Sequence, residues 1–439
     1  MQNTVTVVGA GLAGSECALQ LAKRGVRVRL FEQRPVHASP AHHTDRFAEL
    51  VCSNSLKSTK PDSAAGILKA ELDRMGSFLL GFARQAAVPA GGALAVDRDV
   101  FSSLVTAAVE DNPLIEVIRE EAASIPEGPC VIAAGPLCSD ALFASIESAV
   151  GAGHMSFYDA AAPIVDADSI DRGVVFSQSR YEEGAGDYLN CPMNREEYEA
   201  FIDALLGAER VIARDFEQKD LFCACQPVEE VARTGRDAIR FGALKPVGLT
   251  DPRTGHRPWA AVQLRAENAS AAAYNLVGFQ TNLTWPEQRR VFRMIPGLEN
   301  AEFLRYGVMH RNSFVDSPHV LDRTFKIPGS QVRLAGQICG TEGYVEAIAS
   351  GLLAALNTFA ELNGAPEVRL PLTGSLGSLA DYATDPATKD YQPMHVNFGI
   401  FPPLAVHVRD KAKRREAYAE RAAVDLEAYL STRSDLCLS

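Results

Sequence analysis

Two cysteines near the middle of the chain are the clearest candidates for a catalytic nucleophile. Cys223 and Cys225 stand two residues apart in Phe-Cys-Ala-Cys-Gln-Pro, so in an extended segment both side chains face the same way. A thiolate is a strong nucleophile toward an electron-poor ring once its pKa is lowered. Cysteine is also a small apolar residue that packs in cores, and the residues alone leave both interpretations open.

Cys52 is a second candidate thiol, because it lies in a polar, irregular segment where burial for packing is less expected. His42, His43 and Asp45 stand in the same segment and could ligate a metal. A solvated loop is the favoured interpretation of these three residues, and a single C-x-C without a second pair does not suggest zinc. We therefore predict no metal site.

A glycine-rich turn near the amino terminus predicts a dinucleotide site. Residues 4–8 are β-branched and predict a buried strand, residues 12–24 have helical spacing, and residues 26–31 predict a second strand. Together they form a βαβ unit. The turn between its first strand and its helix consists of Gly9, Ala10, Gly11, Leu12, Ala13 and Gly14.

Each glycine of that turn has a physical role. Gly9 permits the tight turn, Gly11 lets the backbone approach a pyrophosphate at the helix N-terminus, and Gly14 allows close packing of helix and strand. Glu32 ends the second strand and can accept hydrogen bonds from a ribose diol.

Two further glycine elements favour FAD over NAD as the bound dinucleotide. Gly135 ends a predicted strand and can close a turn near a ribityl chain. A second cluster follows the predicted strand 332–336 and leads into a predicted helix at 343–356, whose N-terminal amide groups could face a flavin. The residues of this cluster assigned to the cofactor are Gly336, Gln337, Gly343 and Tyr344.

The succession of elements predicts an α/β fold with two domains. A Rossmann-type, glutathione-reductase-like FAD-binding domain is expected to be discontinuous, over 1–160 and 300–439, because the βαβ pattern lapses and then returns. An α+β domain is expected as an insertion over 161–299, with strands concentrated at 237–265.

The formal net charge of −12 is the wrong sign for a protein that coats nucleic acid by bulk electrostatics. Any RNA partner must therefore meet a local basic patch. One basic cluster stands near the carboxyl terminus and consists of Arg409, Lys411, Lys413, Arg414, Arg415 and Arg421. A solvated helix face is its favoured interpretation, and a phosphate contact surface is the alternative.

The nine cysteines have neither the even number nor the spacing of a secreted disulfide framework. The amino terminus lacks the pattern of a signal peptide, and no uncharged apolar run approaches the ~18 to 20 residues of a membrane span. We therefore expect a cytoplasmic protein without a membrane partner. The oligomeric state stays open.

Taken together, these segments resemble the folate- and FAD-dependent tRNA (uracil-5-)-methyltransferases, the TrmFO family, which is related to GidA-like flavoproteins. The resemblance covers nearly the whole chain and is far more specific than the first glycine turn alone. The matching passages are residues 7–16, 49–57, 89–98, 225–229, 309–314 and 335–347.

This resemblance implies methylation of carbon 5 of the T-loop uridine at position 54 of tRNA. It implies 5,10-methylenetetrahydrofolate as carbon donor, NAD(P)H as reductant and FAD as mediating cofactor. Cys225 matches the thiol of the family's Phe-x-x-Cys-x-Pro motif, Cys52 matches a second reactive thiol, and Tyr344 matches a tyrosine beside the flavin. Cys223 departs from the family pattern, which has one thiol in this motif, and stays a rival to Cys225.

Three other functions compete with this one. GidA-like modification of a wobble uridine shares the flavin-binding style but belongs to longer chains. A flavin oxidoreductase acting on a small metabolite would use the cysteines only for packing. An RNA-binding module that FAD merely stabilises is disfavoured by the acidic net charge.

Overall fold

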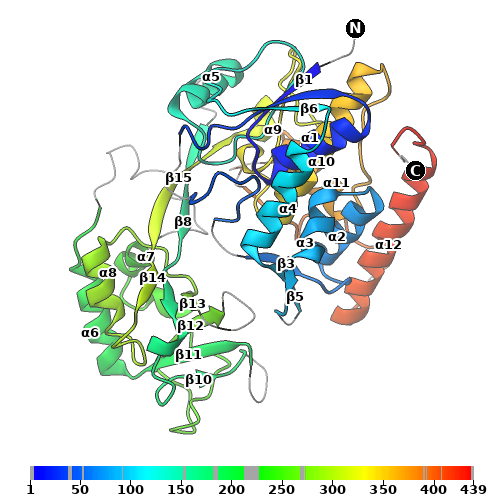
Figure 1. The fold of residues 1–439 in the computed structure, drawn as a ribbon. Helices are drawn as coiled ribbons and strands as arrows, with labels where there is room; N and C mark the ends of the chain where they lie inside the picture. The colour runs from blue at the N-terminus through cyan, green and yellow to red at the C-terminus, as the bar shows by residue number, and fades with distance from the viewer. Residues whose placement is uncertain are drawn as a thin grey trace. The chain divides into compact units, whose positions relative to one another are not determined.

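The computed structural model describes residues 4–37, 42–51, 54–90, 92–151, 155–180, 186–211, 227–266, 271, 273–388, 391, 393–406 and 408–436, without the side chains of 155–161, 305, 308–312 and 411. The chain divides into two compact units (Figure 1). The first is Met1–Ser156 with Asn312–Ser439, and the second is Phe157–Arg311. The first boundary lies four residues before the expected one and the second lies twelve residues after it, and independent folding of two domains stays a prediction.

A five-stranded parallel sheet forms the centre of the first unit. Its strand order is β16-β7-β1-β2-β6, and every neighbouring pair is parallel. Strand β2, which follows β1 in the chain, pairs with one edge of β1, and the later strand β7 pairs with the other edge. Strands β1 and β7 therefore flank a topological switch point, which is where open α/β sheets bind ligands. The strands are β1 (Thr4–Val8), β2 (Arg27–Phe31), β6 (Ile115–Ile118), β7 (Cys130–Ile132) and β16 (Val332–Leu334).

Helices and a small antiparallel sheet complete the first unit. Its helices are α1 (Leu12–Lys23), α2 (Ala64–Arg74), α3 (Phe78–Gln85), α4 (Arg98–Glu110), α5 (Asp140–Val150), α9 (Ser317–Val320), α10 (Tyr344–Leu362), α11 (Ser375–Thr384) and α12 (Lys411–Ser431). The small sheet has the order β3-β5-β4. Its strands are β3 (Ser55–Ser58), β4 (Ala87–Val88) and β5 (Ala93–Val96).

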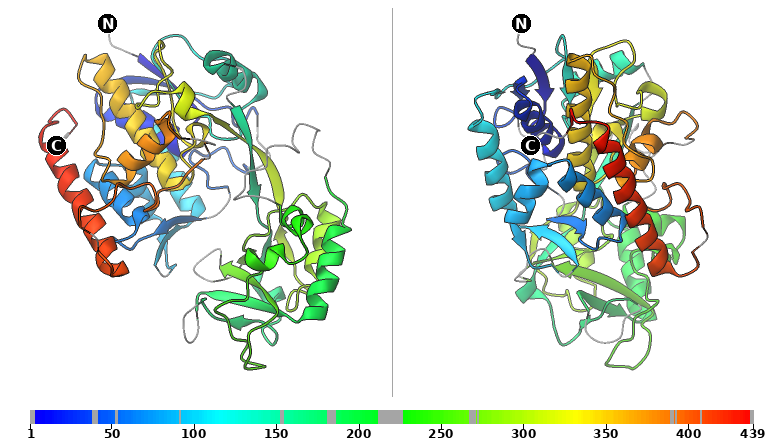
Figure 2. Two further views of the ribbon diagram at one scale, coloured as in Figure 1. Left: turned by 180° about the vertical axis from the view of Figure 1, so that it is seen from behind. Right: turned by 90° about the vertical axis from the view of Figure 1, so that its right-hand side faces the viewer.

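Helix α10 is the central helix of this unit. It is the one helix among the described residues that is long and apolar enough to cross a membrane, but 78% of its most apolar stretch is buried inside the protein. It lies beside α1, as the blue and gold helices of Figure 2 show. Its apolar composition is therefore that of a core helix, which is buried on most sides.

The second unit is an antiparallel sheet with helices, which is an α+β arrangement. The sheet has the order β10-β11-β12-β13-β9-β14, and all its pairings are antiparallel. The strands are β9 (Ile164–Asp166), β10 (Phe176–Ser177), β11 (Tyr188–Met193), β12 (Ala260–Ala266), β13 (Ala273–Leu276) and β14 (Phe303–Arg305), and the helices are α6 (Arg195–Leu206), α7 (Val228–Thr234) and α8 (Trp285–Phe292). A separate two-stranded sheet pairs β8 (Met155–Ala161) with β15 (Val308–Val315).

The expectation that strands are concentrated at 237–265 was wrong. Within that range only β12 is a strand, and the rest consists of a short 3-10 helix, η3 (Ala238–Phe241), followed by turns. Pro246, Pro252 and Pro258 interrupt the segment. Proline cannot donate a ladder hydrogen bond, so repeated prolines prevent a regular strand.

Candidate active site

The glycine-rich turn between β1 and α1 lies at the carboxyl end of the sheet, at the switch point. Gly9 has a φ of +96°, and a Cβ there would lie 2.5 Å from the carbonyl oxygen of Ala133, just after β7. A Cβ on Gly14 would lie 1.7 Å from the Gly9 carbonyl oxygen. The packing of the turn itself therefore requires glycine at both positions.

Gly11 differs from these two glycines, because its own surroundings do not require it. No heavy atom lies within 4 Å of a Cβ built there, and its φ of −72° suits any residue. It precedes α1, whose N-terminus has no side-chain cap, and the following Leu12 and Ala13 are buried. Open space in front of uncapped N–H groups fits a pyrophosphate.

Glu32 follows β2 as a buried carboxylate. It accepts hydrogen bonds from the Ala10 amide at 3.0 Å, the Arg34 amide at 3.0 Å and Arg34 Nε at 2.9 Å. Burial alone would raise the pKa of Glu32, but the hydrogen bonds and charge of Arg34 hold that pKa below its ordinary value. The carboxylate therefore stays ionised and keeps lone pairs for a ribose diol. Sequence reasoning missed Arg34, whose only signal was its position two residues after Glu32.

The two other glycine elements reach the same edge of the sheet. Gly135 follows β7 with a φ of +68°, and β7 is paired with β1. Gly336 follows β16 with a φ of +81°, and its amide donates to Ser350 Oγ at 2.7 Å. Gln337 begins the 3-10 helix η4 (Gln337–Cys339). Parallel strands end together, so these turns and the first glycine turn share one edge.

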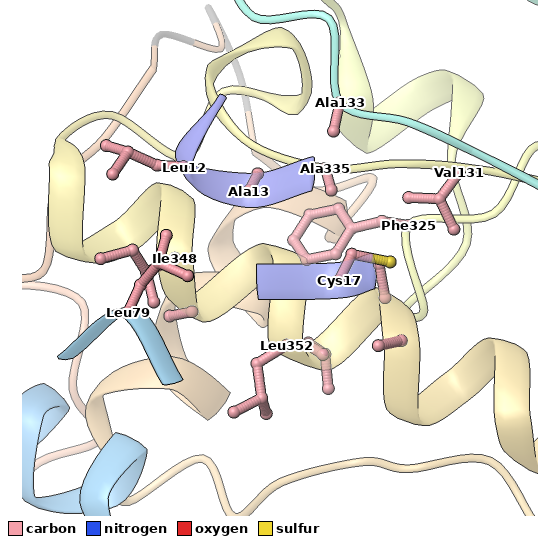
Figure 3. Packing of buried hydrophobic residues seen from close by; sticks show 14 of the residues in the cluster. Leu12, Ala13, Cys17, Leu79, Val131, Ala133, Phe325, Ala335, Ile348 and Leu352 are labelled. Atoms are coloured by element: carbon pink, nitrogen blue, oxygen red, sulfur yellow. The ribbon is translucent and has the colours of Figure 1, made fainter. Parts of the chain in front are cut away.

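Helices α1 and α10 pack backbone to backbone at this edge. A Cβ on Gly351 of α10 would lie 2.1 Å from the Ala13 carbonyl oxygen. Farther along, the guanidinium of Arg24 lies 6.0 Å from the centre of the Phe359 ring, so the helices run parallel. Figure 3 shows Ala13 and Ile348 among the side chains packed here. Because seven residues of α10 precede Gly351, its N-terminus extends about 10 Å beyond that contact.

An ion pair that sequence reasoning missed lies at the N-terminus of α10. Lys57 Nζ donates to Glu346 Oε1 at 2.7 Å, and the Glu346 side chain is fully buried. A Cβ on Gly343 would lie 2.8 Å from that Nζ, so the ammonium lies directly beside Gly343 and close to Tyr344. Glu346 Oε2 is buried without a hydrogen-bond partner among the described residues, which leaves an acceptor that a bound ligand can satisfy.

The predicted reactive thiols, Cys225 and Cys52, lie outside the described residues, as does Cys223. Their reactivity therefore stays a prediction. Burial raises the pKa of four described thiols above the ordinary value, namely those of Cys17, Cys130, Cys191 and Cys339. A buried thiol with a raised pKa is a poor nucleophile, so these four are not alternatives to the predicted pair.

The described residues contain no group of three potential metal ligands, and His42, His43 and Asp45 form none. In the basic cluster, α12 carries an exposed Lys413 and a half-buried Arg415. Its neighbours Arg414 and Arg421 donate to backbone carbonyls of the preceding loop, so part of the cluster has a structural role.

The sheet order, the open turn at Gly11 and the ionised Glu32 define the chain as a Rossmann-type dinucleotide-binding protein, which confirms the expected fold class. The Glucose inhibited division protein A family matches residues 4–366. A solved structure of Aquifex aeolicus GidA has the same fold, with a TM-score of 0.68 and 15% identity over 100% of this chain and 74% of that chain.

Relatives with much higher identity are named methylenetetrahydrofolate–tRNA-(uracil-5-)-methyltransferase TrmFO. One from Geobacter sulfurreducens is 55% identical over 98% of this chain and 100% of its own length. Another from Enterococcus faecalis is 52% identical over 98% of each chain. The chain therefore belongs to the TrmFO family.

Proposed function

We propose that this protein transfers a one-carbon unit from 5,10-methylenetetrahydrofolate to carbon 5 of a uracil in tRNA, the T-loop uridine at position 54, and leaves a methyl group there. The identity of 55% over nearly the full length of a relative with that name carries the proposal. The protein acts in the cytoplasm, and NAD(P)H supplies the two electrons that convert the methylene into a methyl group.

FAD is the cofactor that fits the described residues, and it supplies the redox chemistry of the transfer when bound. The open turn at Gly11 would hold its pyrophosphate, and Glu32 would hold its ribose. Gly135, Gly336 and the N-terminus of α10 would line the rest of the molecule. This set supports a bound dinucleotide, because it combines uncapped amide donors with an ionised acceptor at one sheet edge.

The thiols supply the activation of the base. Carbon 5 of uracil becomes a nucleophile when the Cys225 thiolate forms a bond to carbon 6, which moves an electron pair toward carbon 5 and the carbonyl oxygen. After carbon 5 has taken up the one-carbon unit, its proton must leave and the carbon–sulfur bond must break. Cys52 assists this proton removal or controls the adduct.

Wobble-uridine modification receives less support than uracil methylation. The GidA structure shares 15% identity and extends well beyond the length that this chain covers, whereas the relatives named for uracil methylation match end to end. A small-metabolite oxidoreductase has no specific feature in its favour.

A single experiment tests the proposed function. The protein is incubated with methylene-labelled methylenetetrahydrofolate, NADPH, FAD and an unmodified tRNA transcript, and the label is located by nuclease digestion. We expect 5-methyluridine at position 54 and none in a transcript with cytidine at that position. Steady NADPH consumption without labelled tRNA would refute the proposal, and label in the anticodon loop would favour the wobble-modifying function.

A further inference from the structure

A row of stacked aromatic rings leads from the core of the second unit to its surface. Phe303 and Tyr306 stack with centroids 5.3 Å apart and an interplanar angle of 15°. Tyr306 and Trp285 stack in turn at 5.4 Å and 16°. The inner end of the row contacts the fully buried Phe292, while Trp285 at the outer end is 60% exposed.

The row is held in place before any ligand arrives. Trp285 is the first residue of α8 and is followed by Pro286, which limits backbone freedom there. Arg289, one turn later, donates from Nε and Nη2 to the Tyr306 hydroxyl at 3.0 and 2.6 Å. These contacts orient the middle ring, so the exposed face of Trp285 is a rigid plane.

Helix α8 has more basic than acidic residues, although the whole chain is acidic. α8 carries Arg289 and Arg290, and Arg293 follows it directly. Arg290 pairs with Glu287, but within the described residues no carboxylate pairs with Arg289. A cation beside an exposed aromatic plane matches the two parts of a nucleotide, its phosphate and its base.

We propose that Trp285 is a stacking platform for an unpaired base of the tRNA substrate, with Arg289 beside it as a phosphate contact. The inference rests on the proposed function, which supplies the RNA partner. It goes beyond that function, because it places an RNA contact on the second unit, whereas the basic cluster of α12 belongs to the first. A nucleic acid fits better than a protein, because the exposed face combines a flat ring with unneutralised positive charge.

The test compares exposed aromatic residues of the same unit. Trp285→Ala should weaken equilibrium binding of a tRNA transcript about five- to one-hundred-fold, as expected for one lost base stack. Trp285→Phe, which keeps a smaller ring, should recover most of the affinity. The control is Phe241→Ala, because Phe241 is 84% exposed and stacks on no ring among the described residues, so its removal should leave affinity unchanged.

Two further readouts separate stacking from a general loss of structure or charge. The slope of log affinity against log salt should stay the same in Trp285→Ala, because no phosphate contact is removed. The chain has two tryptophans, and Arg240 covers the ring of Trp259 at 3.8 Å. Binding of tRNA should therefore quench the emission of wild type and not that of Trp285→Phe.

The two hypotheses fail in different ways. If wild type methylates tRNA and Trp285→Ala binds tRNA as tightly as wild type, the stacking platform is wrong and the proposed function stands. If wild type neither binds nor methylates tRNA, the proposed function fails. A tRNA-independent change of oligomeric state in Trp285→Ala, with unchanged tRNA affinity, would assign the exposed ring to a protein contact and overturn the inference.

Discussion

The close contact between α1 and α10 predicts that a glycine-to-alanine substitution there lowers stability, whereas the same substitution at an open position of α3 raises it. In Gly351→Ala the new Cβ would lie 2.1 Å from the Ala13 carbonyl oxygen. An ordinary contact needs about 3.4 Å, so the helices must separate by about 1.3 Å. The neighbouring atoms are backbone and cannot rotate away. In Gly81→Ala, within α3, no atom lies within 4 Å of the new Cβ.

The magnitudes follow from two competing effects. Overpacking costs ~1–3 kcal/mol, and a backbone clash belongs at the upper end. Alanine gains ~0.5–1 kcal/mol over glycine in a helix interior. Gly351→Ala should therefore lower the free energy of unfolding by about 2 kcal/mol, whereas Gly81→Ala should raise it by ~0.5–1 kcal/mol. Gly351→Ala should also weaken FAD binding at least tenfold, because it displaces the first turn of α1.

Urea unfolding followed by flavin fluorescence measures the stability, and titration of the apoprotein with FAD measures the affinity. The matched variant Gly81→Ala controls for helix propensity, since both substitutions add one methyl group to a helix interior. If Gly351→Ala unfolds at the same urea concentration as Gly81→Ala and binds FAD like wild type, the close packing of α1 on α10 is wrong.

Four further predictions concern the cofactor, the thiols, the RNA and pH. Gly11→Leu should fold with wild-type stability but stay colourless with FAD, because the space it fills is the pyrophosphate position; a yellow variant would contradict this. Cys225→Ala should keep FAD but lose both methyl transfer and the covalent adduct with 5-fluorouracil-substituted tRNA. Cys223→Ala should retain methyl transfer and the adduct. An adducted peptide labelled on Cys223 would reverse the assignment. Neutralising Lys413, Arg414 and Arg415 of α12 should weaken tRNA binding and flatten its salt dependence without affecting flavin reduction. Unchanged affinity at several salt concentrations would show that these residues form only a solvated helix face. Burial lowers the pKa of Lys69 from 10.5 to about 8, so the folded protein loses this proton at a lower pH than the unfolded chain does. The free energy of unfolding should therefore rise between pH 8 and 10.5. Lys69→Met should lack this rise, and an equal rise in both proteins would assign it to another group.

Local sequence patterns are sufficient to predict the first secondary-structure elements and the cofactor turn. The β-branched run at 4–8 and the helical spacing from Leu12 onward became β1 and α1, because period and propensity act over neighbouring residues. Glycines with a dihedral or contact requirement, such as Gly9 and Gly135, could be assigned from their positions after strands. The family resemblance likewise depends on short passages that are contiguous in the chain.

The contacts between residues that are distant in the chain depend on the three-dimensional fold. Lys57 and Glu346 are far apart in the chain, and no local pattern predicts that the buried carboxylate receives that ammonium. The stack of Trp285, Tyr306 and Phe303 likewise joins α8 to β14 and the turn after it. Local patterns show that such residues are apolar or charged, but the pairing of elements sets their contacts. That pairing depends on the packing of the whole unit, so it does not follow from any one segment.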